Sequence, residues 1–246
     1  MREFKPGQIL ALTANGGKRY TEIVTMAASR RHTFLYRNGL SIFAVSFFLI
    51  FWAAQAFTGW LEHNDELREK GAIALTFGAY LLSGSFAEVT FENWESEFLQ
   101  MFLYVLVTVK LRQAGSSESK SLDRPEDVDT EPKAGPKAPW PVKKGGWILA
   151  IYKRSLSLAF LFLFLASFGL HASGSYRDYV DDQQLKHEVP KAFMAFLTEP
   201  RVWFESFQNW QSEFLAIASI VLLSIWLRQF GSPESKPVDM PNSETP

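Results

Sequence analysis

Apolar residues gather in long uninterrupted runs along this chain. Residues 40–60 form a run of 21 residues without a charge, and residues 156–176 form a second run of 21 in which His171 is the one titratable side chain apart from the closing tyrosine. At a rise of about 1.5 Å per residue, each run reaches roughly 31 Å as a helix, which matches the hydrocarbon thickness of a bilayer. Both runs are predicted to be membrane-spanning helices.

The pattern of residues 36–120 is written a second time in residues 152–236, at an offset of 116 and without a gap. Between 91–120 and 207–236, 17 of 30 positions are identical. Each copy therefore has the same plan, in which a long apolar run is followed by a polar exit, a middle segment and a shorter apolar run.

The shorter apolar runs are residues 98–111 and 214–227. They reach about 27 Å, within the range of a spanning helix, when they are extended back to Trp94 and Trp210. We therefore predict an all-α integral membrane protein with four transmembrane helices, arranged as two tandem parallel two-helix repeats with amphipathic outer segments.

The middle segments separate the two helices of each copy. Residues 72–86 are apolar but number only 15, whereas residues 188–202 carry charges and two prolines and cannot span. Because the two copies are expected to fold alike, both segments are predicted to be interfacial helices at the outer surface. A re-entrant segment at 72–86 is the alternative.

Polar, proline-rich stretches mark the domain boundaries. We predict a disordered cytoplasmic linker at 121–151 and a disordered tail at 237–246, because neither stretch has enough apolar residues to fold alone. Residues 1–35 are predicted to be a disordered cytoplasmic segment. The part before Met26 has no counterpart in the second copy. We therefore leave open whether translation begins at Met1 or at Met26.

Positive charges predict the orientation. Lys and Arg flank all four predicted spans on one side, whereas residues 61–93, on the other side, carry six acidic and two basic side chains. Cytoplasmic loops of membrane proteins are enriched in Lys and Arg. We expect a multi-pass protein of the cell inner (plasma) membrane of a bacterium, with both termini and the linker in the cytoplasm.

Composition excludes several kinds of chemistry. The chain has no cysteine, so disulfides, thiolate metal sites and cysteine nucleophiles are excluded. The net charge of −1 and the lack of a basic stripe give no indication of nucleic-acid binding. No nucleophile, metal or cofactor motif is present, so we predict no catalytic residue, no metal, no cofactor and no enzymatic activity.

The repeated block around the start of each shorter run supplies the first candidate site. An ionisable residue near a span is a candidate ligand for protons or cations at an outer mouth. The same residues also suit a helix start, with Asn as N-cap, Glu in the first turn and Trp at the interface. The structural interpretation is favoured, since the positions one turn beyond the second block are apolar. The candidates are Asn93, Trp94, Glu97, Asn209, Trp210 and Glu213.

A second candidate is an intramembrane polar pair. Gln55 and His171 occupy equivalent positions of the two copies. A histidine at this depth either shuttles protons or makes an interhelical hydrogen bond, and the hydrogen bond is the commoner role.

The sequence Glu-Ser-Lys closes both copies, at 118–120 and 234–236, beyond the residues that a helix end requires. We interpret it as a cytoplasmic contact or a contact with anionic lipid headgroups.

The motifs of the first copy resemble a family of bacterial membrane proteins of unknown function. The resemblance lies in residues 38–41, 58–60, 91–100 and 115–120, and the second copy departs from it at 174–176, Gln208 and Gln211. It implies membrane placement and no particular activity.

The function expected from these features is that of a structural or accessory membrane protein. Its partners would be the lipid bilayer and a protein partner or a second copy of the chain. The alternative is a small solute or ion conduit that uses the acidic and polar residues at the outer ends of the helices.

Overall fold

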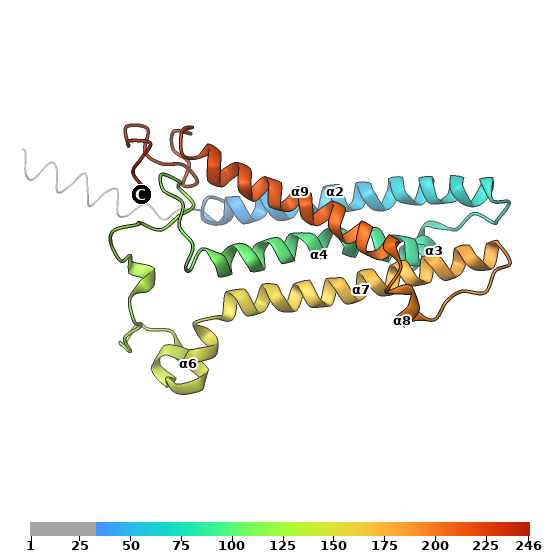
Figure 1. Cartoon of the computed structure of the whole chain (residues 1–246), viewed down its shortest axis with the longest axis horizontal. Helices are drawn as coiled ribbons and strands as arrows, with labels where there is room; N and C mark the ends of the chain where they lie inside the picture. The colour runs from blue at the N-terminus through green and yellow to red at the C-terminus, as the bar shows by residue number, and fades with distance from the viewer. Residues whose placement is uncertain (1–32) are drawn as a thin grey trace, which may run out of the picture. The chain divides into compact units, whose positions relative to one another are not determined.

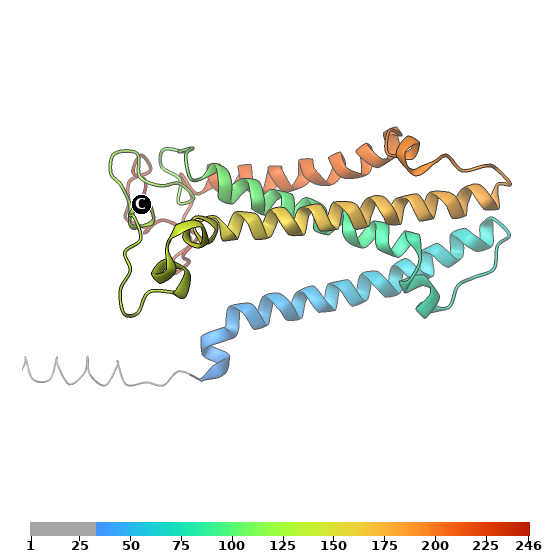
Figure 2. The ribbon, with the colours of Figure 1, turned by 90° about the horizontal axis from the view of Figure 1, so that it is seen from below.

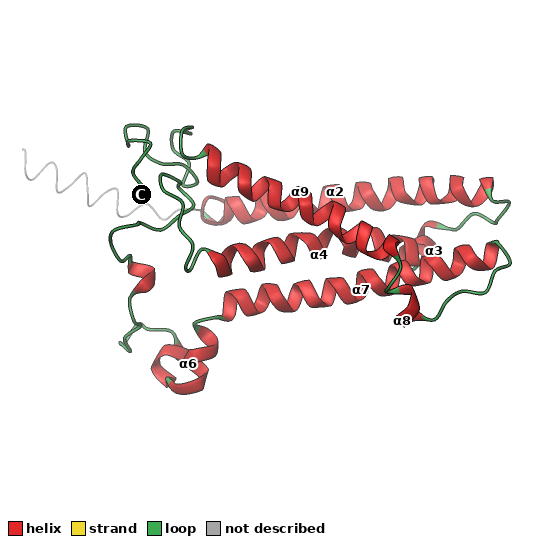
Figure 3. Ribbon diagram, viewed as in Figure 1, coloured by secondary structure: helices red, strands yellow, loops and turns green. Residues whose placement is uncertain are grey.

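The computed structural model describes residues 33–246, so the choice between Met1 and Met26 and nearly all of the predicted N-terminal segment lie outside the described residues. The described part consists of helices and loops without a strand, which confirms the all-α class (Figure 3). The chain divides into two units, one that ends at Gln55 and one from Ala56 to Pro246. Each unit is described by itself below.

Two helices are long and apolar enough to cross a membrane in the described part of the chain. Helix α2 is Phe34–Glu69, with 36 residues, and helix α7 is Ser155–Leu185, with 31 residues. They contain the predicted runs 40–60 and 156–176, so these two runs form helices of the expected kind. Both helices continue past the apolar run into polar residues, at 61–69 and 177–185.

The chain turns back after α2 and α7 through similar contacts. After α2, the indole N–H of Trp60 donates to the carbonyl of Leu75 at 2.8 Å. The Asn64 side chain pairs with both backbone groups of Leu75, at 2.9 and 2.6 Å. After α7, the hydroxyl of Tyr176 donates to the carbonyl of Lys191 at 3.0 Å. Tyr176 and Lys191 lie 116 residues after Trp60 and Leu75.

The middle segments differ from the prediction of interfacial helices. Each begins as a loop, forms one short helix and then enters the next long helix. The short helices are α3, Phe77–Leu81, and α8, Phe193–Phe196, with five and four residues. A helix of that length cannot cross a bilayer. Thr76 caps α3 by accepting from the N–H of Ala79, which ends the loop at a defined residue.

Helices α4, Gly84–Val107, and α9, Pro200–Leu223, have 24 residues each and bounds that differ by 116. They begin ten residues before Trp94 and Trp210, and they end before the predicted limits at 111 and 227. Ser83 sets the start of α4, since its hydroxyl accepts from the N–H of Phe86 at 3.2 Å. The prediction of helix bounds from the apolar runs was therefore wrong at both ends.

Helix α4 packs against both α7 and α9 (Figures 1 and 2). The closest approach is at Gly84 and Gly174. A Cβ atom on Gly84 would lie 2.8 Å from the carbonyl oxygen of Gly174, and one on Gly174 would lie 2.5 Å from the backbone nitrogen of Glu88. Two glycines thus let the helix backbones touch, as small residues do between transmembrane helices.

The predicted disordered linker contains three short helices. They are the 3-10 helix η1, Asp127–Asp129, and the α-helices α5, Trp140–Lys144, and α6, Gly146–Tyr152. Pro139 precedes α5, and Gly145 separates the two α-helices with a φ of 69°. The prediction of disorder for residues 121–151 rests on their average polarity, whereas residues 147–149 in α6 are apolar.

The closing sequences of the two copies fold alike. Gly115 and Gly231 have φ values of 80° and 82°, a conformation that glycine adopts without a Cβ penalty. The hydroxyl of Ser119 accepts from the N–H of Gln113 at 2.9 Å, and Ser235 repeats this bond with the N–H of Gln229 at 2.9 Å. The serine of Glu-Ser-Lys thus has a local structural role in both copies.

The tail after residue 236 contacts the second closing sequence. The Lys236 ammonium group donates to the carbonyls of Pro241, Asn242 and Glu244 at 3.2, 3.1 and 3.0 Å, and Lys236 is 2% exposed. The backbone N–H of Gly115 also donates to the Thr245 hydroxyl, at 3.0 Å. A buried ammonium with three acceptors holds the tail in place.

Candidate functional site

A buried polar cluster joins α4, α7 and α9. Apart from Trp210, the side chains that each helix contributes are three, four, seven or eight residues apart and therefore lie on one helix face. Because α4 packs against both of the other helices, the three polar faces meet inside the unit. The members are Glu88, Glu92 and Glu95 from α4, His171, Ser175 and Asp178 from α7, and Arg201, Glu205, Asn209 and Trp210 from α9.

His171 is the centre of the cluster and bridges two carboxylates. Its Nδ1 atom lies 2.7 Å from Oε2 of Glu95, and its Nε2 atom lies 3.4 Å from Oε2 of Glu205. The hydroxyl of Ser175, one turn further along α7, donates to Oε2 of Glu205 at 3.0 Å. The side chains of His171 and Glu95 expose no surface. The histidine therefore connects all three helices through direct hydrogen bonds.

Side chains of α9 bind two of the α4 glutamates. The indole N–H of Trp210 donates to Oε1 of Glu95 at 3.0 Å. The side-chain amides of Asn209 and Gln208 donate to Oε1 of Glu92 at 2.5 and 3.2 Å. Glu95 thus has a partner on each oxygen, and this arrangement is what a buried carboxylate requires.

Arg201 binds the carboxylates at the end of the cluster away from Glu95. Its guanidinium donates to Oε1 of Glu205 at 2.6 Å, to Oε1 of Glu88 at 2.8 Å and to Oδ2 of Asp178 at 3.0 Å. Three carboxylates on three different helices share this one cation. Arg201 is the most exposed member of the group, with 41% of its side-chain surface accessible.

Hydrogen bonding differs between the carboxyl groups of the cluster. Oε1 of Glu88 accepts from Arg201, whereas its Oε2 atom is buried and has no hydrogen-bond partner among residues 33–246. Both oxygens of Glu205 accept hydrogen bonds, Oε1 from Arg201 and Oε2 from Ser175.

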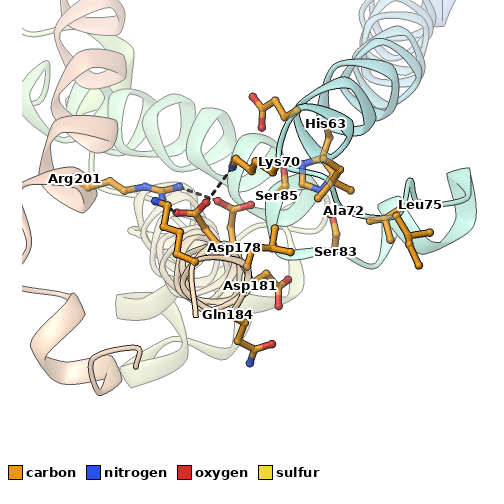
Figure 4. Close-up of a pocket in the computed structure, with 16 residues that line it drawn as sticks. His63, Lys70, Ala72, Leu75, Ser83, Ser85, Asp178, Asp181, Gln184 and Arg201 are labelled. Carbon is orange, nitrogen blue, oxygen red and sulfur yellow. Dashed lines mark hydrogen bonds and ion pairs between the residues drawn. The ribbon is translucent and has the colours of Figure 1, made fainter. Parts of the chain in front are cut away.

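A cavity of about 760 Å³ lies beside Arg201 (Figure 4). It is bordered by the end of α2, the start of α4 and the end of α7. Figure 4 shows Arg201 reaching toward Asp178 on its wall. Lys70 donates to Asp182 at 3.0 Å across the same space. The cluster therefore has one end at a polar cavity and the other at the fully buried Glu95.

The candidates from the first repeated block are not brought together as a site. Asn93 is not an N-cap, since α4 begins at Gly84 and the Asn93 amide donates to the carbonyl of Val89 at 2.7 Å within the helix. Trp94 is half-buried with its ring 5.2 Å from that of Phe91, and Glu97 is exposed.

The candidates from the second block divide into two groups. Asn209 is also inside a helix, not at its start, because Glu199 is the N-cap of α9. Asn209 and Trp210 both belong to the polar cluster. Glu213 is half-buried outside it, and its backbone carbonyl accepts from the Gln100 amide at 2.8 Å. The helix-cap interpretation is therefore wrong for both asparagines.

Of the predicted intramembrane pair, His171 is the centre of the cluster. Gln55 is half-buried in α2, within the unit that ends at that residue. His171 makes interhelical hydrogen bonds in the structure, with Glu95 and Glu205 as its partners.

Sequence reasoning missed most of the acidic members and Arg201. The missed signal was the spacing of Glu88, Glu92 and Glu95, which places three carboxylates on one face of an otherwise apolar helix. Arg201 and Glu205 are an (i, i+4) pair of opposite charge, which is a second signal of the same kind.

The comparison with known families gives one match, to a domain of unknown function, DUF6766, whose model covers residues 31–246. The chain belongs to this family. Both copies of the repeat lie inside the matched residues. No curated protein and no solved structure matches the chain.

Proposed function

We propose that this DUF6766 protein is a four-span protein of the bacterial inner membrane that has no enzymatic activity and acts as a structural or accessory component through lipids or a protein partner. The observation that carries the proposal is the buried cluster centred on His171. Its charged side chains form ion pairs between α4, α7 and α9, and these ion pairs hold the three helices together.

The burial of charged residues in the cluster removes one obstacle to α4 and α9 crossing a membrane. Both helices carry charged residues, which oppose membrane insertion when they face lipid. Glu88, Glu95 and Glu205 are buried against neighbouring helices instead. These three carboxyl groups are turned inward, whereas Glu97 of α4 is exposed. Helices of 24 residues, about 36 Å long, are long enough to cross a bilayer.

The outward surface of these helices supports contact with lipid or with another protein. Large apolar side chains on α7 and α9 are exposed in the structure, in numbers unusual for a surface that faces water. They include Phe162, Leu165 and Leu170 on α7, and Phe204, Phe207, Leu215 and Leu222 on α9.

The placement of the loops supports two spans in each copy. In Figure 1 the loops that precede α3 and α8 lie at one end of the Ala56–Pro246 unit, and the closing sequences and the C-terminus lie at the other. The parallel repeat is supported further by the matching bounds of α4 and α9. Cationic flanks at the end with the closing sequences favour a cytoplasmic position for that end.

Cysteine labelling tests the topology on a background without native cysteine. Ile73→Cys and Val189→Cys occupy the two turn loops at 90% and 91% exposure, and Val128→Cys lies in the linker at 77%. With four spans, a membrane-impermeant maleimide labels both loop positions in intact spheroplasts and labels the linker only after permeabilisation. If only α2 and α7 span, Ile73→Cys and Val189→Cys lie on opposite sides, which contradicts the proposal.

A conduit is the second candidate, because hydrogen bonds run without a break from the cavity beside Arg201 to Glu95. Beyond Glu95 the contacts are aromatic, with ring centroids 6.5 Å apart for Phe98 and Phe160 and 6.4 Å apart for Phe164 and Trp210. The accessory role therefore predicts no proton or monovalent cation flux in proteoliposomes beyond that of protein-free liposomes. A flux that Glu95→Gln abolishes would establish the conduit instead.

A further inference from the structure

The buried cluster contains more acidic groups than basic ones. Five carboxyl groups face one another across α4, α7 and α9, and the cations bonded to them are Arg201 and, when it is protonated, His171. An unmatched buried carboxylate is costly and is relieved by taking up a proton. The five are Glu88, Glu92, Glu95, Asp178 and Glu205.

Hydrogen bonding distinguishes the carboxyl groups from one another. Glu205 accepts from His171, Arg201 and Ser175, and Glu95 accepts from Trp210 in addition to its contact with His171. Both oxygens of each of these two glutamates therefore already have a hydrogen-bond partner.

Glu88 differs from both. Its Oε1 atom accepts from Arg201 at 2.8 Å, but its Oε2 atom is buried and has no hydrogen-bond partner among residues 33–246. The residue is 8% exposed. A proton on Oε2 removes one negative charge from the cluster and leaves the bond to Arg201 intact.

This end of the cluster borders the cavity in Figure 4. Arg201 and Asp178 lie on the cavity wall, and both belong to the hydrogen-bonded group that includes Glu88. No set of three or more His, Asp or Glu side chains in the described part of the chain is arranged to hold a metal ion. A proton is therefore the ligand that fits the site.

We infer that Glu88 is a proton-binding site that is loaded and unloaded through the cavity beside Arg201. In the reaction, the neutral carboxyl group of Glu88 releases its proton to water and becomes a carboxylate, while Arg201 keeps its charge. The new carboxylate faces Asp178 of α7 and Glu205 of α9. It competes with both for the single guanidinium, so the bonds that hold α4 to α7 and α9 depend on proton occupancy.

The test is infrared difference spectroscopy of the full chain in lipid vesicles, titrated from about pH 6 to about pH 10. The wild-type protein is expected to show the C=O band of a protonated buried carboxyl, which is lost as pH rises within this range. Glu88→Gln should remove this band. Glu97→Gln, which changes an exposed glutamate of the same helix, should leave it unchanged.

Two further outcomes would overturn the inference. One is a wild-type spectrum without such a band above about pH 6, which requires no variant to fold. The other is a band that persists in Glu88→Gln or fails to shift when H₂O is replaced by D₂O, since a site reached through the cavity exchanges its proton with solvent. Neither outcome depends on the number of spans or on the accessory role.

Discussion

The imidazole of His171 on α7 binds Glu95 on α4, with 2.7 Å between Nδ1 and Oε2, and both side chains are fully buried. Glu95→Ala would leave His171 without this partner and Trp210 without its acceptor. Removing one partner of a buried charged pair typically costs about 3–5 kcal/mol of unfolding free energy. Tryptophan fluorescence during denaturant titration in detergent micelles measures the loss.

The matched control for this change is Glu97→Ala, two residues further along the same helix. Glu97 is exposed, so its removal is expected to change the unfolding free energy by less than about 0.5 kcal/mol. Equal losses in the two variants would show that Glu95 contributes only helix propensity or solubility.

The contact between Gly84 and Gly174 predicts a size limit at the α4–α7 interface. Gly174→Ala places a methyl group about 2.5 Å from the backbone of Glu88, and the helices must separate to accept it. Overpacking of this kind costs about 1–3 kcal/mol. Gly169→Ala, in the same helix, meets no atom within 4 Å and is expected to stabilise the protein by up to about 1 kcal/mol through helix propensity. Similar effects of the two substitutions would argue against the close approach.

Stability is expected to depend on pH through Glu88. By the inference above, Glu88 holds a proton in the folded protein near neutral pH, whereas a glutamate of the unfolded chain is ionised there, so the folded state holds one more proton than the unfolded state. The unfolding free energy therefore falls as pH rises until Glu88 has lost its proton, by up to about 1.4 kcal/mol per unit. Unfolding of wild-type protein at a series of pH values measures the slope.

Glu88→Gln provides the comparison, because glutamine keeps the shape of the neutral carboxyl. The variant should show a flatter profile around neutral pH and should be the more stable protein at a pH at which Glu88 of the wild type has lost its proton. A profile as steep as that of the wild type would assign the pH dependence to another group.

Lys236 is expected to hold the C-terminal tail. Lys236→Met removes three donor bonds to the carbonyls of residues 241, 242 and 244, so residues 237–246 should be cut faster by a non-specific protease. Lys120→Met is the control, since Lys120 occupies the same position of the first copy and binds the side chain of Asp129 instead. Mass spectrometry of timed digests follows the tail, and equal cleavage rates in the two variants would contradict the role of Lys236.

The two long helices were predictable because each depends on its own composition. A run of 21 residues without a charged group is favourable in a membrane whatever surrounds it, and α2 and α7 contain those runs. The bounds of α4 and α9 were not predictable from hydropathy, because their N-terminal halves carry glutamates. Hydropathy counts these residues as polar and does not show that several of them are buried. Glu95 and Glu97 are two residues apart and chemically alike, yet one is fully buried and the other exposed.

The sequence by itself determined the all-helical class, the two long apolar helices and the offset of 116 that relates the bounds of α4 and α9. These properties follow from local composition and from positions along the chain. The tertiary structure alone decided which polar residues meet. Hydrogen bonds between Glu95, His171 and Glu205 connect helices that are far apart in the sequence, and they depend on the close packing of α4 against α7 and α9.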